Sequence, residues 1–327
     1  MPRFLPVQLT RRDLLLGAST CAVLGVACQR PPSAPAVRTL ILATGGVGGA
    51  FHQAGTELSR LVDDGRQGFR LTLIPGSSGA NLDALQSGRA QVAFAQADVA
   101  YAAYRRGTDV VPTPHSQLRG IAVLWLNTFQ LVVRRDGPIT RVSDLRHRRI
   151  SVGAAGGGSA TLARLVLESS GIGADDVTIT NTGFDDSIAE FRDRRIDAML
   201  FSAGIPTQPL ISVAREPGFR LVPVPHTAVT RMRAQYPFLE PQVIVAGTYP
   251  GLDTPIETLG IPILMTCRAD LEDDLVRNLT LVLFRELPAL QQRVTAAAAI
   301  DLDLAPASPL PLHPGAARFY RERELEQ

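Results

Sequence analysis

The chain has 327 residues, a length that predicts two domains of about 150 residues each. Hydrophobic residues make up 45% of the chain and charged residues 20%, a globular balance that excludes a disordered or coiled-coil protein. All 33 basic residues are arginine, and the absence of lysine excludes a Schiff-base lysine, a Walker-type phosphate loop and a protein-kinase site.

Residues 1–28 are typical of an export signal rather than of a folded domain. The twin-arginine pattern Arg11-Arg12 precedes an apolar run of 14 residues, which is shorter than the roughly 20 residues that span a bilayer. Cleavage before Cys28 would leave a lipid-carrying cysteine at the new N-terminus, whereas Ala34-Pro35-Ala36 offers a second cleavage site, and an uncleaved membrane anchor is a third interpretation. Residues 29–38 are then a proline-rich tether. Either cleavage predicts a location in the periplasm or on the outer face of a membrane.

The remaining body has no net charge and no sign of a metal or cofactor site. Without residues 1–28 it keeps 30 basic and 30 acidic residues, so no basic stripe predicts nucleic-acid binding. Its one cysteine, Cys267, lies in an apolar run and is expected in the core without a disulfide partner. The five histidines have no metal-ligand spacing, and we expect neither a metal nor a cofactor.

Short β-type runs alternate with helical stretches along the body, which predicts an α/β fold. The expected strands are 40–43, 70–74, 91–95, 121–126, 129–133, 150–152, 177–180, 198–201, 242–247 and 260–267. The expected helices are 49–62, 81–85, 99–104, 159–170, a helix near Ile188, and 271–287. Asn127-Thr128 splits two apolar runs, and we expect the chain to change domain there. We therefore predict one lobe from 39–127 and 222–327, and a second lobe from 128–221.

Two glycine-rich loops, 44–51 and 153–161, each join a strand to a helix. Free N–H groups at a helix start attract anions, and the helix dipole adds to this attraction. Each loop alone is equally compatible with a tight turn, or with a simple helix cap by Ser159. The two loops together predict a cleft in which facing helix starts hold a small anion without any lysine.

A third polar loop, Pro75 to Asn81, partly matches the nucleophile elbow G-x-S-x-G and fails it at Ala80. A serine hydrolase with Ser78 as nucleophile and His226 or His313 as base is therefore an alternative function. No other arrangement of residues predicts catalysis, and we expect a binding protein rather than an enzyme.

Several segments occur in the order and spacing of one family. They are Thr44 to Gly55, Ser77 to Leu82 with Gln96-Ala97-Asp98, Gly158 to Thr161, Gly204-Ile205-Pro206, Gly247 to Gly251, and Leu312 to Ala316 with Tyr320 and Glu322. From residue 39 to residue 324 the body resembles the TAXI-type solute-binding proteins of TRAP transporters. Phe51 stands where the family usually has tyrosine.

The resemblance implies a two-lobed, type II periplasmic-binding-protein fold with a ligand cleft between the lobes. It also implies a small carboxylate such as glutamate, glutamine or 2-oxoglutarate as ligand, and a sodium-coupled TRAP-type membrane permease as partner. A binding protein of an ABC-type importer is the alternative, because both systems use two-lobed receptors. The predicted ligand-binding residues are Thr44, Gly48, Gly49, Phe51, Ser78, Asn81, Gln96, Gly158, Ser159, Ala160, Thr161 and Gly204.

Overall fold

A computed structural model describes residues 37–47, 49–63, 66–215 and 218–325. The predicted export signal with Cys28, and residues 29–36 of the predicted tether, lie outside the described residues. The body that begins at Arg38 forms one unit and is described by itself. No helix among the described residues is both long enough and apolar enough to cross a membrane.

The strands of the body join in one ten-stranded sheet with the order β2-β1-β3-β10-β4-β7-β5-β6, to which β8 adds beside β4 and β9 beside β10. The strands are β1 (Arg38–Thr44), β2 (Phe69–Pro75), β3 (Val92–Gln96), β4 (Leu118–Arg134), β5 (Arg149–Ser151), β6 (Thr178–Thr180), β7 (Ala198–Ala203), β8 (Phe219–Leu221), β9 (Glu240–Ile244) and β10 (Ile256–Arg268). β1 pairs in parallel with β2 and β3, and β5 pairs in parallel with β6 and β7. Each parallel group has helices after its strands, as expected for an α/β fold.

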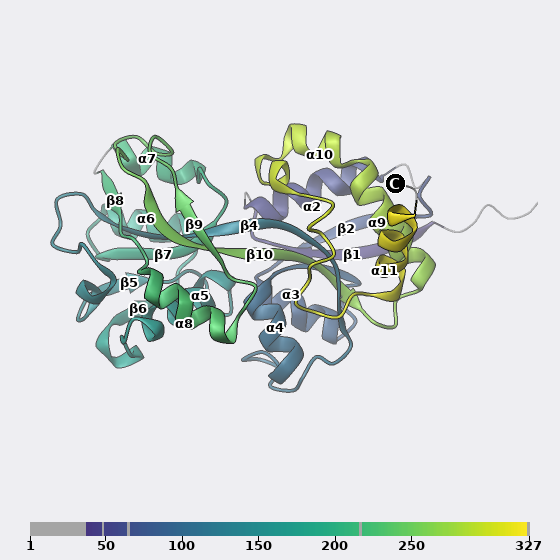
Figure 1. The fold of residues 1–327 in the computed structure, drawn as a ribbon, viewed down its shortest axis with the longest axis horizontal. Coiled ribbons are helices and arrows are strands. Elements are labelled where there is room, and N and C mark those ends of the chain that lie inside the picture. The colour runs from purple at the N-terminus through teal and green to yellow at the C-terminus, as the bar shows by residue number, and fades with distance from the viewer. Residues whose placement is uncertain (1–36, 48, 64–65, 216–217, 326–327) are drawn as a thin grey trace, which may run out of the picture. The chain divides into compact units, whose positions relative to one another are not determined.

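Helices cover both faces of the sheet (Figure 1). The α-helices are α2 (Ala50–Leu61), α3 (Ser78–Gln86), α4 (Ala97–Arg106), α5 (Gly158–Ser169), α6 (Phe184–Arg192), α7 (Gln208–Arg215), α8 (His226–Gln235), α9 (Asp273–Arg285), α10 (Leu287–Arg293) and α11 (Pro314–Glu324). Short 3₁₀ turns form at η1 (Val142–Leu145), η2 (Ala174–Asp176) and η3 (Thr295–Ala299). The predicted strand–glycine–helix units at 40–62 and 150–170 are confirmed as β1–α2 and β5–α5.

Two long antiparallel strands, β4 and β10, connect the two parallel groups (Figure 1). β4 is one continuous strand of 17 residues, although the sequence divides it at Asn127-Thr128. The pairing partners change at that point. β10 pairs with β3 through residues 263–267 and with β9 through 256–260, while β4 pairs with β7 through 128–133. The pairing partners of these strands therefore change from one parallel group to the other near Asn127-Thr128.

The predicted return to the first lobe at residue 222 differs from the structure. Helix α8 packs against α5, and β9 pairs with the first half of β10. Ile244, Tyr249 and Leu252 join a buried cluster that contains Phe191 and Phe201 of the second group. Residues 222–255 therefore pack with the second lobe, and the chain returns to the first lobe through β10.

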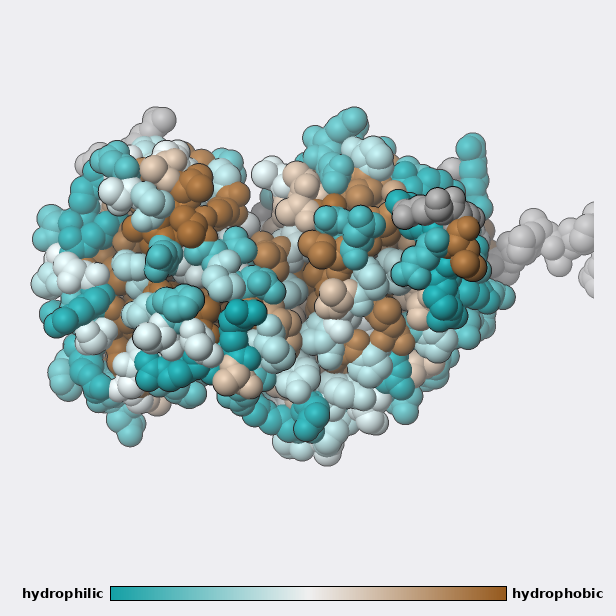
Figure 2. Space-filling model, in the orientation of Figure 1, coloured by the Kyte–Doolittle hydropathy of each residue, from teal (hydrophilic) through white to brown (hydrophobic). Residues whose placement is uncertain are grey.

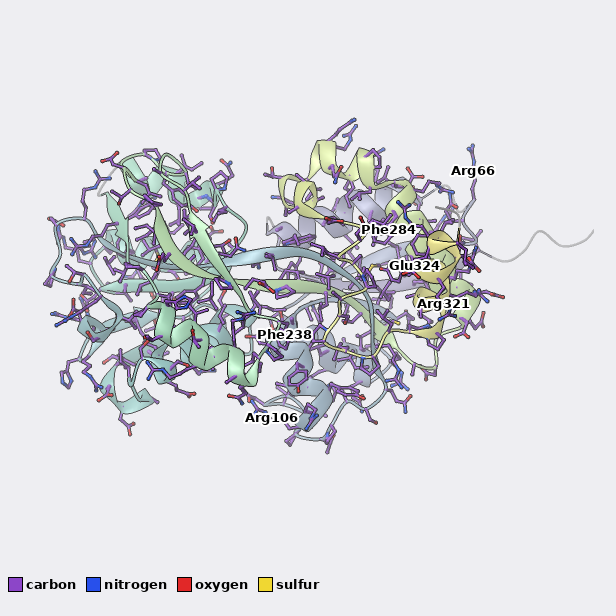
Figure 3. All side chains as sticks on the ribbon, viewed as in Figure 1. Arg66, Arg106, Phe238, Phe284, Arg321 and Glu324 are labelled. Carbon is purple, nitrogen blue, oxygen red and sulfur yellow. The ribbon has the colours of Figure 1, made fainter. Side chains whose placement is uncertain are left out.

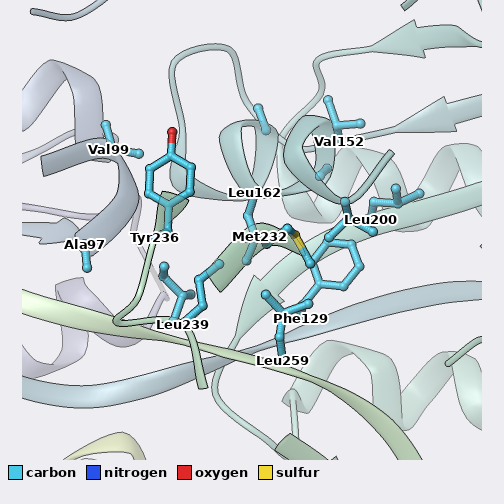
Figure 4. Close-up of a cluster of buried hydrophobic side chains, with 14 of the residues drawn as sticks. Ala97, Val99, Phe129, Val152, Leu162, Leu200, Met232, Tyr236, Leu239 and Leu259 are labelled. Carbon is cyan, nitrogen blue, oxygen red and sulfur yellow. The ribbon is translucent and has the colours of Figure 1, made fainter. Parts of the chain in front are cut away.

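One apolar cluster extends from the first group of elements into the second. Figure 4 shows Ala97 and Val99 of α4 in the same buried cluster as Leu162 of α5 and Tyr236 and Leu239 after α8. Because these side chains come from both lobes, the lobes share buried hydrophobic surface on the side of α4, α5 and α8.

Some hydrophobic side chains stay on the surface. Figure 2 shows hydrophobic residues exposed near β9 on the face viewed, where Val243 is 48% and Val245 62% exposed.

The predicted core residue Cys267 is fully buried and is a free thiol. Burial raises the pKa of that thiol far above its usual range, which makes it unreactive at neutral pH.

Candidate functional site

Both glycine-rich loops end at a helix start, as predicted. In the first loop the N–H of Gly49 donates to the carbonyl of Gly46, 3.1 Å away, just before α2 begins at Ala50. In the second loop Gly156 has a φ of +67°, a left-handed conformation that favours glycine, and α5 begins at Gly158. Gly48, one of the predicted ligand-binding residues, lies outside the described residues.

The second loop touches the first lobe directly, beside the third polar loop. The N–H of Gly79 donates to the carbonyl of Gly156 over 3.1 Å, and the hydroxyl of Ser77 donates to the same carbonyl over 3.5 Å. A Cβ atom at Gly79 would lie only 2.8 Å from the Gly156 oxygen. The lobes therefore meet at this point without space for an added methyl group.

Gln96, at the end of β3, forms two hydrogen bonds to the second lobe. Its Nε2 donates to the carbonyl of Gly158 at the start of α5 over 2.9 Å. Its Oε1 accepts from the hydroxyl of Ser202 on β7 over 2.5 Å. Within the first lobe, its main-chain N–H donates to Ser78 Oγ and its Nε2 also donates to Asp98 Oδ1. Since Gln96 is 2% exposed, these bonds are made out of contact with water.

Asp98 adds an uncompensated carboxylate beside Gln96. Its Oδ1 accepts from Gln96 Nε2 over 3.1 Å and from the N–H of Val99 over 2.7 Å. Its Oδ2 is buried and has no hydrogen-bond partner. Burial of the carboxyl raises the pKa of Asp98 to about 6, although both hydrogen bonds act to lower it.

A second contact between the lobes is aromatic. The ring of Tyr101 on α4 meets the rings of Tyr236 and Phe238, which follow α8, edge to face at centroid distances of 6.3 and 5.6 Å. Figure 3 shows Phe238 between the end of α8 and α4. The lobes are thus held by hydrogen bonds at the loops and by apolar packing beside them.

Two predicted ligand contacts have structural roles in the first lobe. Asn81 Nδ2 donates to the carbonyls of Thr44 and Phe94 over 2.9 and 2.8 Å, so both of its amide hydrogens are used inside the lobe. The Thr44 side chain is fully buried, and its hydroxyl points to the carbonyls of Gly45 and Ile74. These side chains hold the first glycine loop against the sheet. In the sequence alone, a polar loop residue with this structural role cannot be distinguished from one that binds a ligand.

The aromatic residue of the first loop packs inside its own lobe. The half-buried ring of Phe51 meets Phe94 and Trp125 edge to face at centroid distances of 6.0 and 6.1 Å. Trp125 Nε1 donates to Asn127 Oδ1 at the point where β4 changes partners. The first glycine loop is therefore connected through Phe51 and Trp125 to β4, one of the two long strands that join the parallel groups.

The predicted residues of the second lobe lie together at the start of α5. Ser159 Oγ accepts from the N–H of Ser202 over 3.1 Å, and Thr161 Oγ1 donates back to the carbonyl of Gly157. Ala160, in the first turn of α5, is fully buried, so its side chain packs in the core. Gly204 follows β7 and has open space beside its Cα.

The structure adds residues that the sequence did not point to. Ser202 contacts Gln96, but a serine within an apolar strand gives no sequence signal of that contact. Tyr249 Oη accepts from the N–H of Thr207 and donates to Gln130 Oε1, over 2.9 and 2.5 Å. Thr207 also donates to the carbonyl of Gly204, so Tyr249 fixes the segment that follows β7.

Among the described residues, one cavity lies beside α2 and another beside the end of α3. One, of about 320 Å³, is lined by His52, Gln53, Thr56, Glu57, Arg293 and Val294. The other, of about 400 Å³, is lined by Gln86, Ser87, Gly88, Ala90, Gln91, Arg268, Asp270 and Leu271. Neither is lined by a predicted ligand-binding residue.

The site has no arrangement typical of a metal centre or a catalytic serine. Within the described residues, no group of three or more histidine, cysteine or acidic side chains could hold a metal ion. Ser78 Oγ accepts from the N–H of Gln96, and His313 Nδ1 accepts from the N–H of Gly315. In the described part of the chain neither His226 nor His313 is hydrogen-bonded to Ser78, so the nucleophile–base pair of the hydrolase alternative is not formed.

Comparison with known proteins identifies the family and the fold. The NMT1-like family matches residues 42–323, and the chain belongs to that family. The periplasmic binding protein BugD is 15% identical, with a TM-score of 0.55 over 88% of this chain and 96% of BugD. XAC2383 from Xanthomonas citri, solved bound to ATP, is 17% identical, with a TM-score of 0.54 over 88% of this chain and 98% of its own. A TctC solute binding protein from Polaromonas is 15% identical, with a TM-score of 0.50 over 90% of this chain and 97% of its own.

These likenesses show the fold alone. The chain has the α/β fold of periplasmic binding proteins, consistent with the two-lobed type II arrangement that the sequence predicts. The three loops described above follow the carboxyl ends of β1, β2 and β5, and Gln96 is the last residue of β3. This is the edge at which α/β sheets of this kind bind their ligands.

Proposed function

We propose that this member of the NMT1-like family is an extracytoplasmic solute-binding protein that closes two lobes on a small carboxylate. The observation that carries the proposal is the meeting of the loop before α5 with Gln96 and Gly79 of the first lobe. A helix start offers several N–H groups to one anion, and a buried carboxylate needs several hydrogen bonds to offset its lost hydration.

The same contacts imply that the lobes open for the solute to enter. A solute reaches the start of α5 only when the bonds of Gln96 to Gly158 and Ser202 are broken, because these bonds fill the space between the lobes. The β4–β10 crossing, where the pairing partners change, is the expected hinge. Gly48, Gly49, Ser78, Gln96, Gly158, Ser159, Thr161 and Gly204 remain the proposed ligand contacts, while Thr44, Phe51, Asn81 and Ala160 support them from within each lobe.

The motifs that resemble TAXI proteins favour a TRAP-type permease as the membrane partner. The names of two similar structures, a TctC solute binding protein and the periplasmic binding protein BugD, agree with a transport role and do not name the transporter. A receptor for an ABC-type importer is the alternative, and a neighbouring gene for an ABC permease rather than a TRAP permease would favour it.

Native mass spectrometry of the freshly purified protein tests the binding function. We expect a fraction of the protein to carry one small carboxylate, released on denaturation and identified by its mass. Absence of any retained molecule, together with no thermal stabilisation by a panel of mono-, di- and tricarboxylates, would contradict the proposal.

The intact mass also identifies the N-terminus. Export by the twin-arginine route and lipidation predict a lipid-modified chain that begins at Cys28, whereas cleavage after Ala36 gives an unmodified chain.

A further inference from the structure

Asp98 has a place and a chemistry that the proposed contacts do not use. It is the second residue of α4, 1% exposed, and its Oδ2 has no hydrogen-bond partner. Buried carboxylates in proteins are normally paired with a cation or fully hydrogen-bonded, since an unpaired buried charge is costly. A half-satisfied carboxylate at the sheet edge where ligands bind therefore indicates a missing partner.

No charged side chain of the described residues supplies that partner. Helix α4 packs against α3, α5, β3 and β10, against the segment that follows α8, and against His115, whose N–H donates to the carbonyl of Ala103. The titratable groups of these segments are Asp83, His115, Arg164, Glu168, Tyr236, Glu257, Cys267 and Arg268, and α4 itself carries Tyr101, Tyr104, Arg105 and Arg106. None of these forms a salt bridge with Asp98, whose carboxylate accepts hydrogen bonds from the amide of Gln96 and from the N–H of Val99.

The connection to Gln96 places Asp98 beside the space that the solute would occupy. One Gln96 amide nitrogen donates both to Asp98 Oδ1 and to the carbonyl of Gly158 at the start of α5. When a solute separates Gln96 from Gly158, the Gln96 amide that borders the opened contact is still hydrogen-bonded to the carboxylate of Asp98. The helix start supplies donors for the negative end of the solute, and Asp98 supplies an acceptor for a positive end.

On this basis, and resting on the proposed function, we propose that Asp98 pairs with a positively charged nitrogen of the solute. The substrate class is then a small zwitterion of the α-amino-acid type rather than an amine-free carboxylate. Asp98 acts as a specificity-determining residue: it selects for the ammonium group, while the helix starts bind the carboxylate.

Matched pairs of solutes test the proposal with the full-length mature protein. The pairs are L-glutamate with 2-oxoglutarate, L-leucine with 4-methyl-2-oxopentanoate, and L-alanine with pyruvate, which differ only in the amine or keto group. We expect calorimetry at pH 7.5 to show binding of at least one amino acid, at least tenfold tighter than its 2-oxo partner. In Asp98→Asn the preference should fall to within about threefold, since one charged pair is lost. Asp83→Asn, which changes another buried carboxylate of the same lobe, should keep the preference.

A second measurement can be made on the wild-type protein, with a variant as its control. Because burial raises the pKa of Asp98 to about 6, most of the carboxyl holds a proton at pH 5.5. Pairing with an ammonium group requires the ionised form, so amino-acid binding at pH 5.5 should release close to one proton. Calorimetry in two buffers of different ionisation enthalpy measures that release, which should be absent in Asp98→Asn.

The outcomes separate the two proposals. Tighter binding of the 2-oxo acids, or equal binding of both members without proton release, overturns the role of Asp98 and leaves a carboxylate-binding protein. Equal weakening of both members in Asp98→Asn indicates a purely structural residue and also overturns it. If no member of any pair binds and native mass spectrometry finds no retained solute, the proposed function itself fails.

Discussion

At the scale of single residues, neighbouring polar groups of the site differ in how many of their possible hydrogen bonds they form. Gln96 uses both polar atoms of its side chain, toward Asp98, Gly158 and Ser202. Asp98 beside it keeps one bare oxygen. A neutral amide tolerates burial when all its bonds are made, whereas an ionised carboxylate lacking a cation does not. Asp98 is therefore one residue at which the stability of the protein depends on pH.

The pH dependence of that linkage has a definite sign. The pKa of Asp98 is about 6 in the folded protein and has an ordinary value of 3.8, so between these values the folded state holds more protons than the unfolded state. The contribution of Asp98 to the free energy of unfolding then falls as pH rises through this window. A difference of about two units corresponds to about 3 kcal/mol. We expect Asp98→Asn to gain about that much stability relative to the wild type between pH 4 and pH 7, measured by urea unfolding.

Asp197→Asn is the control with the opposite sign. The hydrogen bond from the Arg149 side chain lowers the pKa of Asp197, so its stabilising contribution is present at neutral pH and is lost as the pH falls below its ordinary value. The Asp197→Asn variant should therefore lose stability relative to the wild type at pH 7, and less so at pH 3, below the ordinary value of 3.8. A pH-independent difference between wild type and Asp98→Asn would show that Asp98 stays ionised in the folded protein.

At the scale of elements, the first glycine loop is coupled to the crossing strands by aromatic side chains. Phe51 is the second residue of α2 and lies against Trp125 of β4, whose indole N–H donates to Asn127. Trp125 is the only tryptophan of the chain, so its emission reports on this place alone. We expect a bound carboxylate to change the intensity or wavelength of that emission, since the loop that binds it holds Phe51.

Phe51→Leu tests the coupling. The variant keeps the apolar volume in part but removes the edge-to-face contact, so the emission change on binding should shrink while calorimetric affinity stays within about threefold. Tyr101→Phe, on the opposite side of the lobe contact, should leave the emission change as in wild type. A solute that binds by calorimetry without any emission change would contradict coupling of the loop to β4.

The sequence predicts these elements unequally, for physical reasons. The junctions β1–α2 and β5–α5 are predictable because a glycine run between an apolar strand and a periodic helix has few other conformations. The placement of α8 and β9 is not, because a short helix and an edge strand carry no local sign of which sheet edge they join. Asn81 shows the same limit within the site: its two donors fit a ligand or two carbonyls equally well, and only the folded chain shows the carbonyls of Thr44 and Phe94 beside it.

At the scale of the whole molecule, the contact between the lobes combines hydrogen bonds with apolar packing. Hydrogen bonds of Gly79 and Gln96 hold the loops together, and the cluster of Tyr101, Tyr236 and Phe238 holds the side of α4 and α8. Such a two-part contact allows a hinge motion in which one part separates while the other keeps its packing. The equilibrium between open and closed forms is then set by the small difference between these bonds and a solute's own contacts.

Gly79→Ala shifts that equilibrium without changing any side chain that we propose to bind the solute. Its new methyl group would lie 2.8 Å from the carbonyl oxygen of Gly156, and because a backbone oxygen cannot move aside independently, the lobes must separate. We expect a larger radius of gyration by small-angle X-ray scattering and weaker solute binding by at least tenfold, with little change in the urea midpoint. Gly46→Ala is the matched control, since a methyl group there meets nothing within 4 Å. If Gly79→Ala scattered and bound like the wild type, closure through these loops would be refuted, because the contact that must form for closure could not form in that variant.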